Sequence, residues 1–193
     1  NDCTGNRPPK EEILEQMMSA LSHRGPDQGK SWLSDHAALG FRRLAIIDPG
    51  GSTQPMVNET KDKVLVFNGE IYNYQALRLE LLSAGPRFST QGDSEVLLHG
   101  YEEWGEQLPQ HLRGMFAFAI WDEKAQTLFA ARDPFGIKPF YYTMAGGSFI
   151  FASELMGILP HPAYEKRLNR EALEQYLSFQ YSVLENTFFQ GMR

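Results

Sequence analysis

The sequence predicts a single α+β domain with mostly antiparallel sheets as its inner layers and helices outside. Three observations lead to this prediction. Helical and strand patterns occur in mixed order: a helix, strands, two helices, many strands and a helix. Several strands are apolar on both faces, so they must be covered from above and below. No repeat, low-complexity tract or boundary divides the 193 residues, so we expect one domain over 1–193.

The first part of the chain is expected to form one helix followed by paired strands. Apolar residues with helical spacing indicate the helix, namely Ile13, Leu14, Met17, Met18 and Leu21. Glycine and proline in the motif HRGPD (23–27) end this helix and make the motif a rigid corner. Short paired strands are expected at 32–33 and 37–41. The run RLAIID (43–48) continues as a strand until Pro-Gly-Gly stops it.

A short strand and two amphipathic helices follow. The run VLVF (64–67) is a strand of four apolar residues. Asn73 is a candidate N-cap for the first helix, which Gly85-Pro86 closes, and Asp93 opens the second. The residues expected to face inward are Tyr74, Leu77, Leu81 and Leu82 in the first helix, and Val96, Leu97, Leu98, Tyr101 and Trp104 in the second.

The remaining chain predicts four strands and a final helix. The strands are MFAFAIWD (115–122), TLFAARD (127–133), KPFYY (138–142) and SFIFASE (148–154), separated by turn residues. Asn169 is the candidate N-cap of the final helix, which contains Leu173, Tyr176 and Leu177.

Composition excludes several functional classes. With 42% hydrophobic and 22% charged residues, the chain has the makeup of an ordinary soluble globular protein. A net charge of −6 with scattered Lys and Arg leaves no basic face for nucleic acid. The single cysteine excludes an internal disulfide framework and fits a reducing, cytoplasmic compartment. No apolar run suits a bilayer or a signal peptide, and no Cys/His cluster has zinc spacing, so no metal is predicted.

The pair Asn68-Gly69 directly follows the apolar strand, where we expect the chain to turn. An asparagine side chain carries two N–H donors, and a glycine lets the backbone approach a ligand closely. Together they can direct a side-chain N–H and a main-chain N–H at a developing oxyanion, as acyl transfer requires. Asn-Gly is also common in tight turns. These two residues alone leave both interpretations open.

Two further charged positions could recognise a free amino acid. Arg42 and Arg43 lie in an apolar strand, where one guanidinium must face the covered side. Its partner could be a substrate carboxylate or a buried aspartate. Asp93 could bind an ammonium group or only cap its helix. An arginine for a carboxylate, an aspartate for an ammonium and an oxyanion site would suit hydrolysis at an amino acid's side chain.

Six motifs occur in the order and spacing of the glutamine-hydrolysing asparagine synthetases: HRGPD, RRLAIID, FNGEIYNY, GDSEVLL, GMFAFAIWD and ARDPFGIKPFYY. From about Glu11 onward, the chain resembles the N-terminal class II glutamine amidotransferase domain of that family. The resemblance implies an N-terminal-nucleophile fold, a four-layer αββα sandwich of two mostly antiparallel sheets. It also implies hydrolysis of glutamine to glutamate and ammonia through a cysteine thioester.

The resemblance also assigns residue roles. Arg43 would bind the glutamine α-carboxylate, and Asp93 its α-ammonium, with Glu70 lining the same pocket. Asn68 and the N–H of Gly69 would form the oxyanion hole. Ammonia would pass to a C-terminal synthetase domain, where ATP and Mg²⁺ serve the amidation of aspartate. The amidotransferase domain itself needs no cofactor, and we expect neither nucleic acid nor membrane as a partner. Homo-oligomers are possible.

Both ends of the sequence depart from the family pattern. Family members begin with a nucleophilic cysteine whose own α-amine acts as general base. The pKa values of an α-amine and a thiol are close, so proton transfer from the thiol to the amine is nearly balanced. Cys3 is neither terminal nor followed by an apolar strand, so we expect the nucleophile and the first strand upstream of Asn1. No Ser-Gly-Gly pyrophosphate loop follows, so the synthetase sites are not expected here. The alternative is an inactive domain that keeps the glutamine pocket for binding or assembly.

Overall fold

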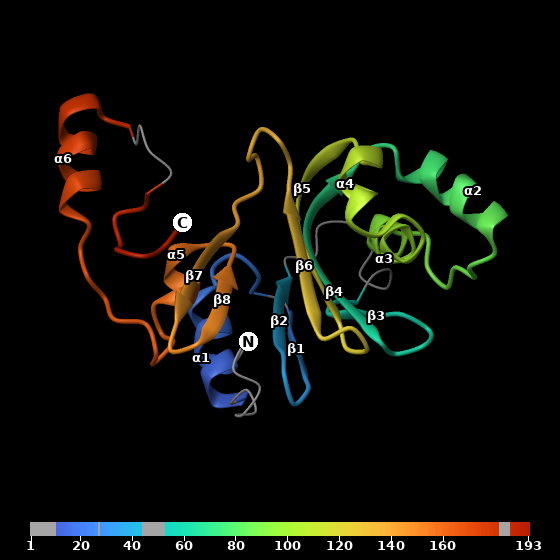
Figure 1. Ribbon diagram of the computed structural model, residues 1–193, viewed down its shortest axis with the longest axis horizontal. Helices are drawn as coiled ribbons and strands as arrows, with labels where there is room; N and C mark the ends of the chain where they lie inside the picture. Colours follow the sequence, from blue (N-terminus) through green and yellow to red (C-terminus); the bar gives the residue numbers. More distant parts are fainter. Residues whose placement is uncertain (1–10, 27, 44–52, 182–185) are drawn as a thin grey trace. The chain divides into compact units, whose positions relative to one another are not determined.

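The structure is a computed structural model that describes residues 11–26, 28–43, 53–181 and 186–193 (Figure 1). It divides into two compact units. Unit 1 comprises Asn1–His23, Leu33–Ala38 and Phe140–Arg193, and unit 2 comprises Arg24–Trp32 and Leu39–Pro139. The single domain over 1–193 stays a prediction.

Helices and strands occur in the mixed order that the sequence predicts. The helices are α1 (Glu11–Ala20), α2 (Tyr74–Ala84), α3 (Asp93–Trp104), α4 (Leu108–His111), α5 (Leu155–Ile158) and α6 (Arg170–Phe179), with a 3-10 turn at Gly105–Gln107. The strands are β1 (Gln28–Leu33), β2 (Ala38–Arg43), β3 (Met56–Val57), β4 (Lys63–Ile71), β5 (Gly114–Asp122), β6 (Thr127–Arg132), β7 (Tyr141–Ala145) and β8 (Ser148–Ala152). The pairs β3–β4, β4–β5, β5–β6 and β7–β8 are all antiparallel. The predicted α+β class is confirmed.

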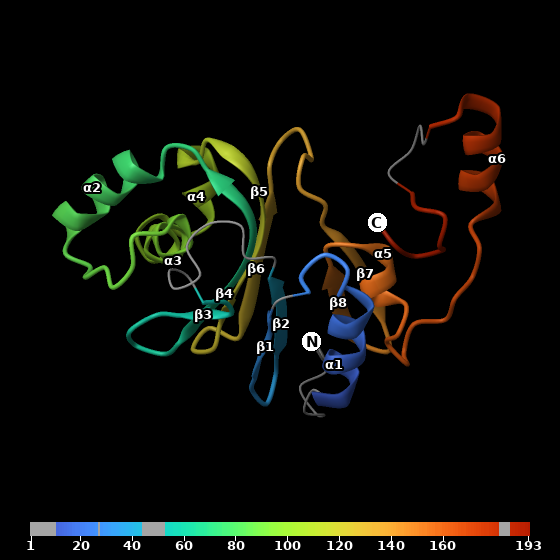
Figure 2. The same ribbon diagram turned by 180° about the vertical axis from the view of Figure 1, so that it is seen from behind.

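Unit 2 is built on a four-stranded sheet in the order β3-β4-β5-β6. Helices α2 and α3 cover one face of this sheet, as the front and back views both show (Figures 1 and 2). Alternate residues of β4, namely Leu65, Phe67 and Ile71, are buried in the core with the helices. Side chains two residues apart lie on the same face of a strand, so this face of β4 packs against α2 and α3.

The strand β4 is longer than its apolar run. It continues through Asn68-Gly69 to Ile71 and pairs with β5 from Lys63↔Asp122 to Ile71↔Gly114. The expectation that the chain turns at Asn68-Gly69 is therefore wrong, and the tight-turn interpretation of this pair is excluded. The sequence concealed this because asparagine and glycine are depleted in strands, whereas the pairing partner in β5 is supplied from more than 40 residues away.

The helices of unit 2 agree with the predicted stripes except at one position. Leu77 and Leu81 of α2 are buried, but Leu82 is 45% exposed and does not belong to the inward face. Gly85 ends α2 in a left-handed conformation, as predicted. Asn73 occupies the N-cap position without a capping hydrogen bond from its side chain. Its side chain instead bonds the backbone of His111 and Arg113, joining α2 to the chain that enters β5.

Unit 1 contains the antiparallel pair β7–β8 and the helices α1, α5 and α6. Helix α1 packs on α5, and α5 packs on β8. The buried core residues are Ile150, Ala152, Ile158, Tyr164 and Met192. The predicted N-cap of α6 is confirmed, because the Asn169 side chain accepts a hydrogen bond from the N–H of Ala172. Tyr176 and Leu177 of this helix are 44% and 71% exposed.

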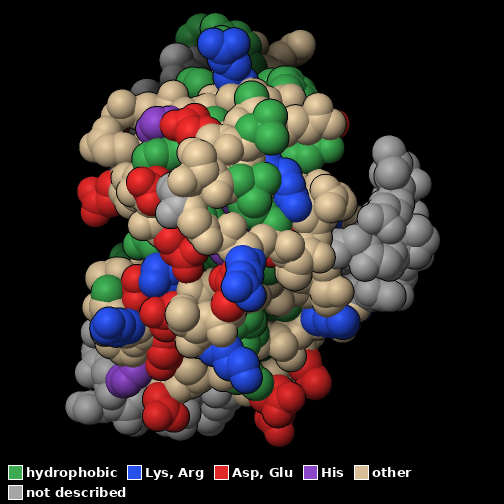
Figure 3. Space-filling view, turned by 90° about the vertical axis from the view of Figure 1, so that its right-hand side faces the viewer, with side chains coloured by type: hydrophobic (Ala, Val, Ile, Leu, Met, Phe, Trp, Pro, Cys, Tyr) green, Lys and Arg blue, Asp and Glu red, His purple; other side chains and the backbone are tan. Residues whose placement is uncertain are grey.

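Three further sequence predictions concern the strand over 43–48, the lack of a membrane-crossing helix and the scattered surface charge. The strand expected over 43–48 lies outside the described residues apart from the end of β2. None of the helices in the described part of the chain has the length and apolarity to cross a membrane. On the face of unit 2 that carries α2 and α3, acidic and basic side chains are intermixed (Figure 3).

The motif ARDPFG forms a loop organised by a single buried carboxylate. The side chain of Asp133, in a residue only 3% exposed, accepts hydrogen bonds from the backbone N–H groups of Phe116, Phe135, Ile137 and Lys138. Burial alone would raise the pKa of Asp133, but these N–H donors hold it below its ordinary value. The ionised carboxylate is therefore the form that stabilises the loop after β6.

We expect Asp133→Asn to lower the free energy of unfolding by about 3 kcal/mol at neutral pH, because a charged acceptor of several buried N–H groups is lost. Because the folded pKa is depressed, this stabilisation is complete above the unfolded value of about 3.9 and disappears as the pH falls through the folded pKa. Urea unfolding at pH 7 and near pH 3 should show the deficit shrinking in acid. Asp35→Asn, at an exposed aspartate, is the control. Equal stability of Asp133→Asn and wild type at pH 7 would contradict this role.

Candidate functional site

The candidate site lies on the edge of β4 that faces away from β5. Phe116 of β5 directs both its backbone N–H and its C=O to Asp133, not to Gly69 opposite it. Gly69 and Phe116 are therefore a non-hydrogen-bonded pair, and the N–H of Gly69 points to the other edge. Strand β3 covers that edge only as far as Leu65. The edge beyond Leu65 is left for other partners.

Every second N–H along this edge has a defined environment. The N–H of Phe67 donates to Oε1 of Gln54 at 2.6 Å, and the N–H of Ile71 donates to Oδ2 of Asp93 at 3.1 Å. Between them lies the N–H of Gly69, for which no acceptor occurs among the described residues. An unpaired main-chain donor held between two fixed neighbours is suited to bind an anionic oxygen.

Gly69 is required by the close approach of β4 and β5. Its φ is +152°, and a Cβ built on it would lie 2.1 Å from the Met115 carbonyl oxygen and 2.7 Å from Cα of Phe116. Gly114, opposite Ile71, is crowded in the same way, since its Cβ would lie 2.2 Å from the carbonyl oxygen of Glu70. The two glycines allow both backbones to run close together at this end of the sheet.

Asn68 contributes a second donor next to the N–H of Gly69. Its side chain is half-buried on the sheet face opposite to the core residues Phe67 and Ile71. The described part of the chain provides no hydrogen-bond partner for this amide. The two N–H groups of this half-buried amide are not used within the described chain, so Asn68 is suited to bind a polar atom of a ligand.

Asp93 and Glu70 form the acidic side of the site. Asp93 is the first residue of α3, and Gly92 is the N-cap, so the prediction that Asp93 caps the helix is wrong. Burial raises the pKa of Asp93, and the charge of Glu70 raises it further, against hydrogen bonds from backbone N–H groups including that of Ile71. A cation bound between the two carboxylates would reverse this penalty. Asp93 is therefore suited to bind an ammonium group.

Gln54 is a residue of the site that the sequence did not reveal. Its side chain is buried, with 7% exposed, and bonds both backbone groups of Phe67, accepting from N–H and donating to C=O at 3.1 Å. The amide thus acts as an extra strand residue that fixes β4 two residues before Gly69. No local pattern indicates this contact, because Gln54 and Phe67 are 13 positions apart and the periodicity of a helix or a strand does not relate them.

The residue predicted to bind the α-carboxylate, Arg43, is described only in its backbone. Arg43 ends β2, but its side chain is not among the described ones, and Cys3 lies outside the described residues. The neighbouring Arg42 is half-buried, and its Nε is buried without a hydrogen-bond partner in the described chain. The structure thus places Asn68, Gly69, Glu70 and Asp93 together in unit 2 and leaves Arg43 as a prediction.

Comparison with known proteins identifies the family. Residues 2–193 match the family described as "Glutamine amidotransferase domain". The chain belongs to this family. The glutamine amidotransferase domain is 43% identical over 187 residues to asparagine synthetase [glutamine-hydrolyzing] 3 of Bacillus subtilis, covering 95% of this chain and 30% of that protein. It is 45% identical over 172 residues to asparagine synthetase [glutamine-hydrolyzing] 1 of the same organism, covering 89% of this chain and 27% of that protein.

Solved structures support the same fold. The amidotransferase domain superimposes on the allosteric regulatory enzyme of purine biosynthesis with a TM-score of 0.66 and 25% identity, over 79% of this chain and 41% of that one. Glutamine phosphoribosylpyrophosphate amidotransferase from B. subtilis gives a TM-score of 0.63 at 22% identity, over 84% of this chain and 44% of that one. The predicted family, fold class and enzyme class, a glutamine amidotransferase, are confirmed. The chain spans about 30% of the length of its first curated relative.

Proposed function

We propose that this domain hydrolyses glutamine to glutamate and ammonia at the open edge of β4. The observation that carries the proposal is that, within the described residues, the N–H of Gly69 and the neighbouring Asn68 amide have no partner, while the Asp93 carboxylate is held at Ile71 on the same edge. Two donors converging on a carbonyl oxygen form an oxyanion hole. A carboxylate at a fixed distance along the strand would bind the α-ammonium of free glutamine, a group that a glutamine residue within a protein chain lacks.

The proposed reaction needs a thiolate that attacks the carbonyl carbon of the glutamine side chain. The electron pair of the C=O moves onto oxygen, where Asn68 and the N–H of Gly69 stabilise it. When the tetrahedral intermediate collapses, the C–N bond breaks, the leaving nitrogen takes a proton from the protonated general base and departs as ammonia, and a thioester remains. Water then hydrolyses the thioester to glutamate. We assign the nucleophile to an N-terminal cysteine outside these residues, with its α-amine as general base, rather than to Cys3.

The remaining roles follow from charge. Arg43 would bind the α-carboxylate of glutamine through two N–H bonds, and Glu70 would line the pocket beside Asp93. By similarity to the asparagine synthetases, we propose that ammonia passes to a synthetase domain that amidates aspartate with ATP and Mg²⁺. No cofactor is needed in the domain itself, and a cytoplasmic location suits this chemistry.

An inactive domain that only binds glutamine is the competing function. Glutamate release from glutamine by the full-length protein separates the two, and this release should disappear after thiol alkylation. Glutamine binding without any glutamate release by the untreated full-length protein would favour the inactive domain instead.

We expect Arg43→Ala to raise the KM for glutamine by about 30-fold or more, because losing one side of a charge-paired contact costs about 2–4 kcal/mol. The measurement is glutamate release against glutamine concentration. Arg42→Ala is the matched control. Arg42 directly precedes Arg43 in the strand and faces the opposite side of the sheet, so this substitution should change stability more than KM. An unchanged KM in Arg43→Ala would show that Arg43 has only a structural role.

A further inference from the structure

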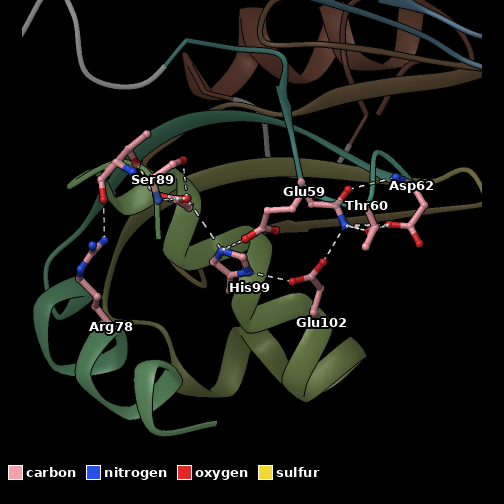
Figure 4. Close-up of polar contacts among 10 residues, drawn as sticks. Glu59, Thr60, Asp62, Arg78, Ser89, His99 and Glu102 are labelled. Carbon is pink, nitrogen blue, oxygen red and sulfur yellow. Dashed lines mark hydrogen bonds and ion pairs between the residues drawn. The ribbon is translucent and has the colours of Figure 1, made fainter. Parts of the chain in front are cut away.

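Four ionisable side chains of unit 2 form a second polar cluster, here called the His99 cluster: Glu59, Glu95, His99 and Glu102 (Figure 4). Glu95, His99 and Glu102 project from α3 at helical spacing, and Glu59 comes from the turn between β3 and β4. The three glutamates surround one imidazole. His99 is only 2% exposed, so this imidazole lies inside the unit.

One nitrogen of the imidazole is already engaged. Nδ1 of His99 lies 2.8 Å from Oε2 of Glu102, and Oε1 of Glu102 accepts a hydrogen bond of 2.7 Å from Nδ2 of Asn58. This arrangement favours a proton on Nδ1, which donates to Glu102. The lone pair is then on Nε2. A carboxylate that fixes the tautomer in this way is the usual outer-shell partner of a metal-binding histidine.

The other nitrogen is buried and unpaired. Nε2 of His99 makes no hydrogen bond within the described chain. It lies 3.7 Å from Oε1 of Glu59 and 3.9 Å from Oε1 of Glu95, beyond hydrogen-bond distance. Two ligand atoms, each about 2.1 Å from a zinc ion, are about 3.4 Å apart at a tetrahedral angle. Each of the two distances from Nε2 therefore needs only a small contraction for the nitrogen and that carboxylate oxygen to bind one ion.

The carboxylate of Glu95 is held in place before any ion binds. The residue is 6% exposed, and its two oxygens accept four hydrogen bonds from the N–H and hydroxyl groups of Ser89 and Thr90. Glu59 has a side chain that is 54% exposed, which opens the cluster to solvent on one side. A buried anchor and an exposed ligand give an ion both a fixed position and a route of entry.

The charges of the cluster also favour a cation. The positive group facing Glu102 from β4 is Lys63. Three carboxylates thus face one imidazole, and a divalent cation would neutralise more of this charge than a proton does.

We propose that Nε2 of His99, with the carboxylates of Glu59 and Glu95, binds a divalent transition-metal ion for which zinc is the natural probe. Glu102 orients the imidazole, and water completes the coordination. The ion would fasten the β3–β4 turn to α3, separately from the glutamine site. Sequence spacing gave no sign of this, because Glu59 and His99 are 40 positions apart and no cysteine takes part.

Zinc titration of the 193-residue protein by calorimetry tests the proposal, with Glu59→Gln as the main variant. Glu59 is largely exposed, so this substitution should leave the fold intact while removing one ligand. We expect one zinc ion per chain and at least tenfold weaker binding by Glu59→Gln. Glu103→Gln, at the exposed neighbour of Glu102 on α3, is the matched control and should bind zinc as the wild type does.

The ring nitrogens of His99 provide a second measurement by NMR. Zinc should shift the Nε2 resonance while the Nδ1–H bond to Glu102 is kept. The proposal is overturned if zinc does not bind, if Glu59→Gln binds it as tightly as wild type, or if the His99 ring resonances stay unchanged at saturating zinc. Each of the last two results would place the ion elsewhere on the chain.

Discussion

Asn68→Ala is expected to lower kcat for glutamine hydrolysis by about 10²–10³-fold, the usual effect of losing one oxyanion donor. The KM should change little, because the donor acts mainly on the charge that develops in the transition state. The Asn68 amide has no partner among the described residues, so its removal should also leave the free energy of unfolding within about 0.5 kcal/mol of wild type. Steady-state glutamate release and urea unfolding of the full-length protein measure the two effects.

Asn68→Asp and Gln75→Ala are the controls for this prediction. Asn68→Asp keeps the shape of the side chain but replaces its N–H donors with a negative charge, so kcat should fall at least as far as in Asn68→Ala. Gln75→Ala removes an exposed amide from α2 and should leave kcat unchanged. If Asn68→Ala lost stability but kept its kcat, Asn68 would be a structural residue and the oxyanion role would be wrong.

Gly69→Ala is expected to destabilise the fold by about 3 kcal/mol or more, since a methyl group cannot fit between the paired backbones of β4 and β5. The nearest atom to the new Cβ would be the Met115 carbonyl oxygen at 2.1 Å, which is backbone and cannot rotate away. The loss is a large part of the total stability of an ordinary domain. Chemical unfolding measures it, and glutamate release should fall as well because the Gly69 N–H would be displaced.

Gly85→Ala separates crowding from backbone strain. Gly85 also has a positive φ, +115°, but a Cβ there would meet no atom within 4 Å. We expect Gly85→Ala to cost only about 1 kcal/mol, the usual penalty of a left-handed alanine. Equal losses of stability in the two variants would mean that the close approach of β4 and β5 has no energetic consequence.

The sequence predicted the elements whose signals are local. Helices α2 and α3 followed from apolar residues at helical spacing, the left-handed Gly85 from its place after the last apolar turn, and the cap at Asn169 from its place before α6. These features depend on residues within one turn of each other, so they can be predicted from a short stretch of sequence. Leu82 was misplaced because the sequence does not show where the apolar stripe of a helix, which is several residues wide, has its edges.

Features that depend on distant residues could not be predicted. The extension of β4 through Gly69 requires the glycine-containing start of β5, and Asn73 turned from its helix to the backbone at His111. The Gln54 side chain bonds the backbone of Phe67 as a neighbouring strand would, and no sequence pattern predicts such a contact. The candidate site was predicted in part, because Asn68, Gly69 and Asp93 stand in short motifs, whereas the supports around them lie elsewhere in the sequence.

Titration of the ¹⁵N-labelled 193-residue protein with L-glutamine, followed by NMR, shows whether the open edge of β4 binds glutamine. We expect the backbone amide of Gly69 and the side-chain amide of Asn68 to shift most. L-norvaline, which keeps the α-groups but lacks the carboxamide, should shift Ile71 beside Asp93 and leave the Asn68 side chain unchanged. Glutamine at saturating concentration that moved neither Gly69 nor Asn68 would contradict the assignment of the open β4 edge as the glutamine site.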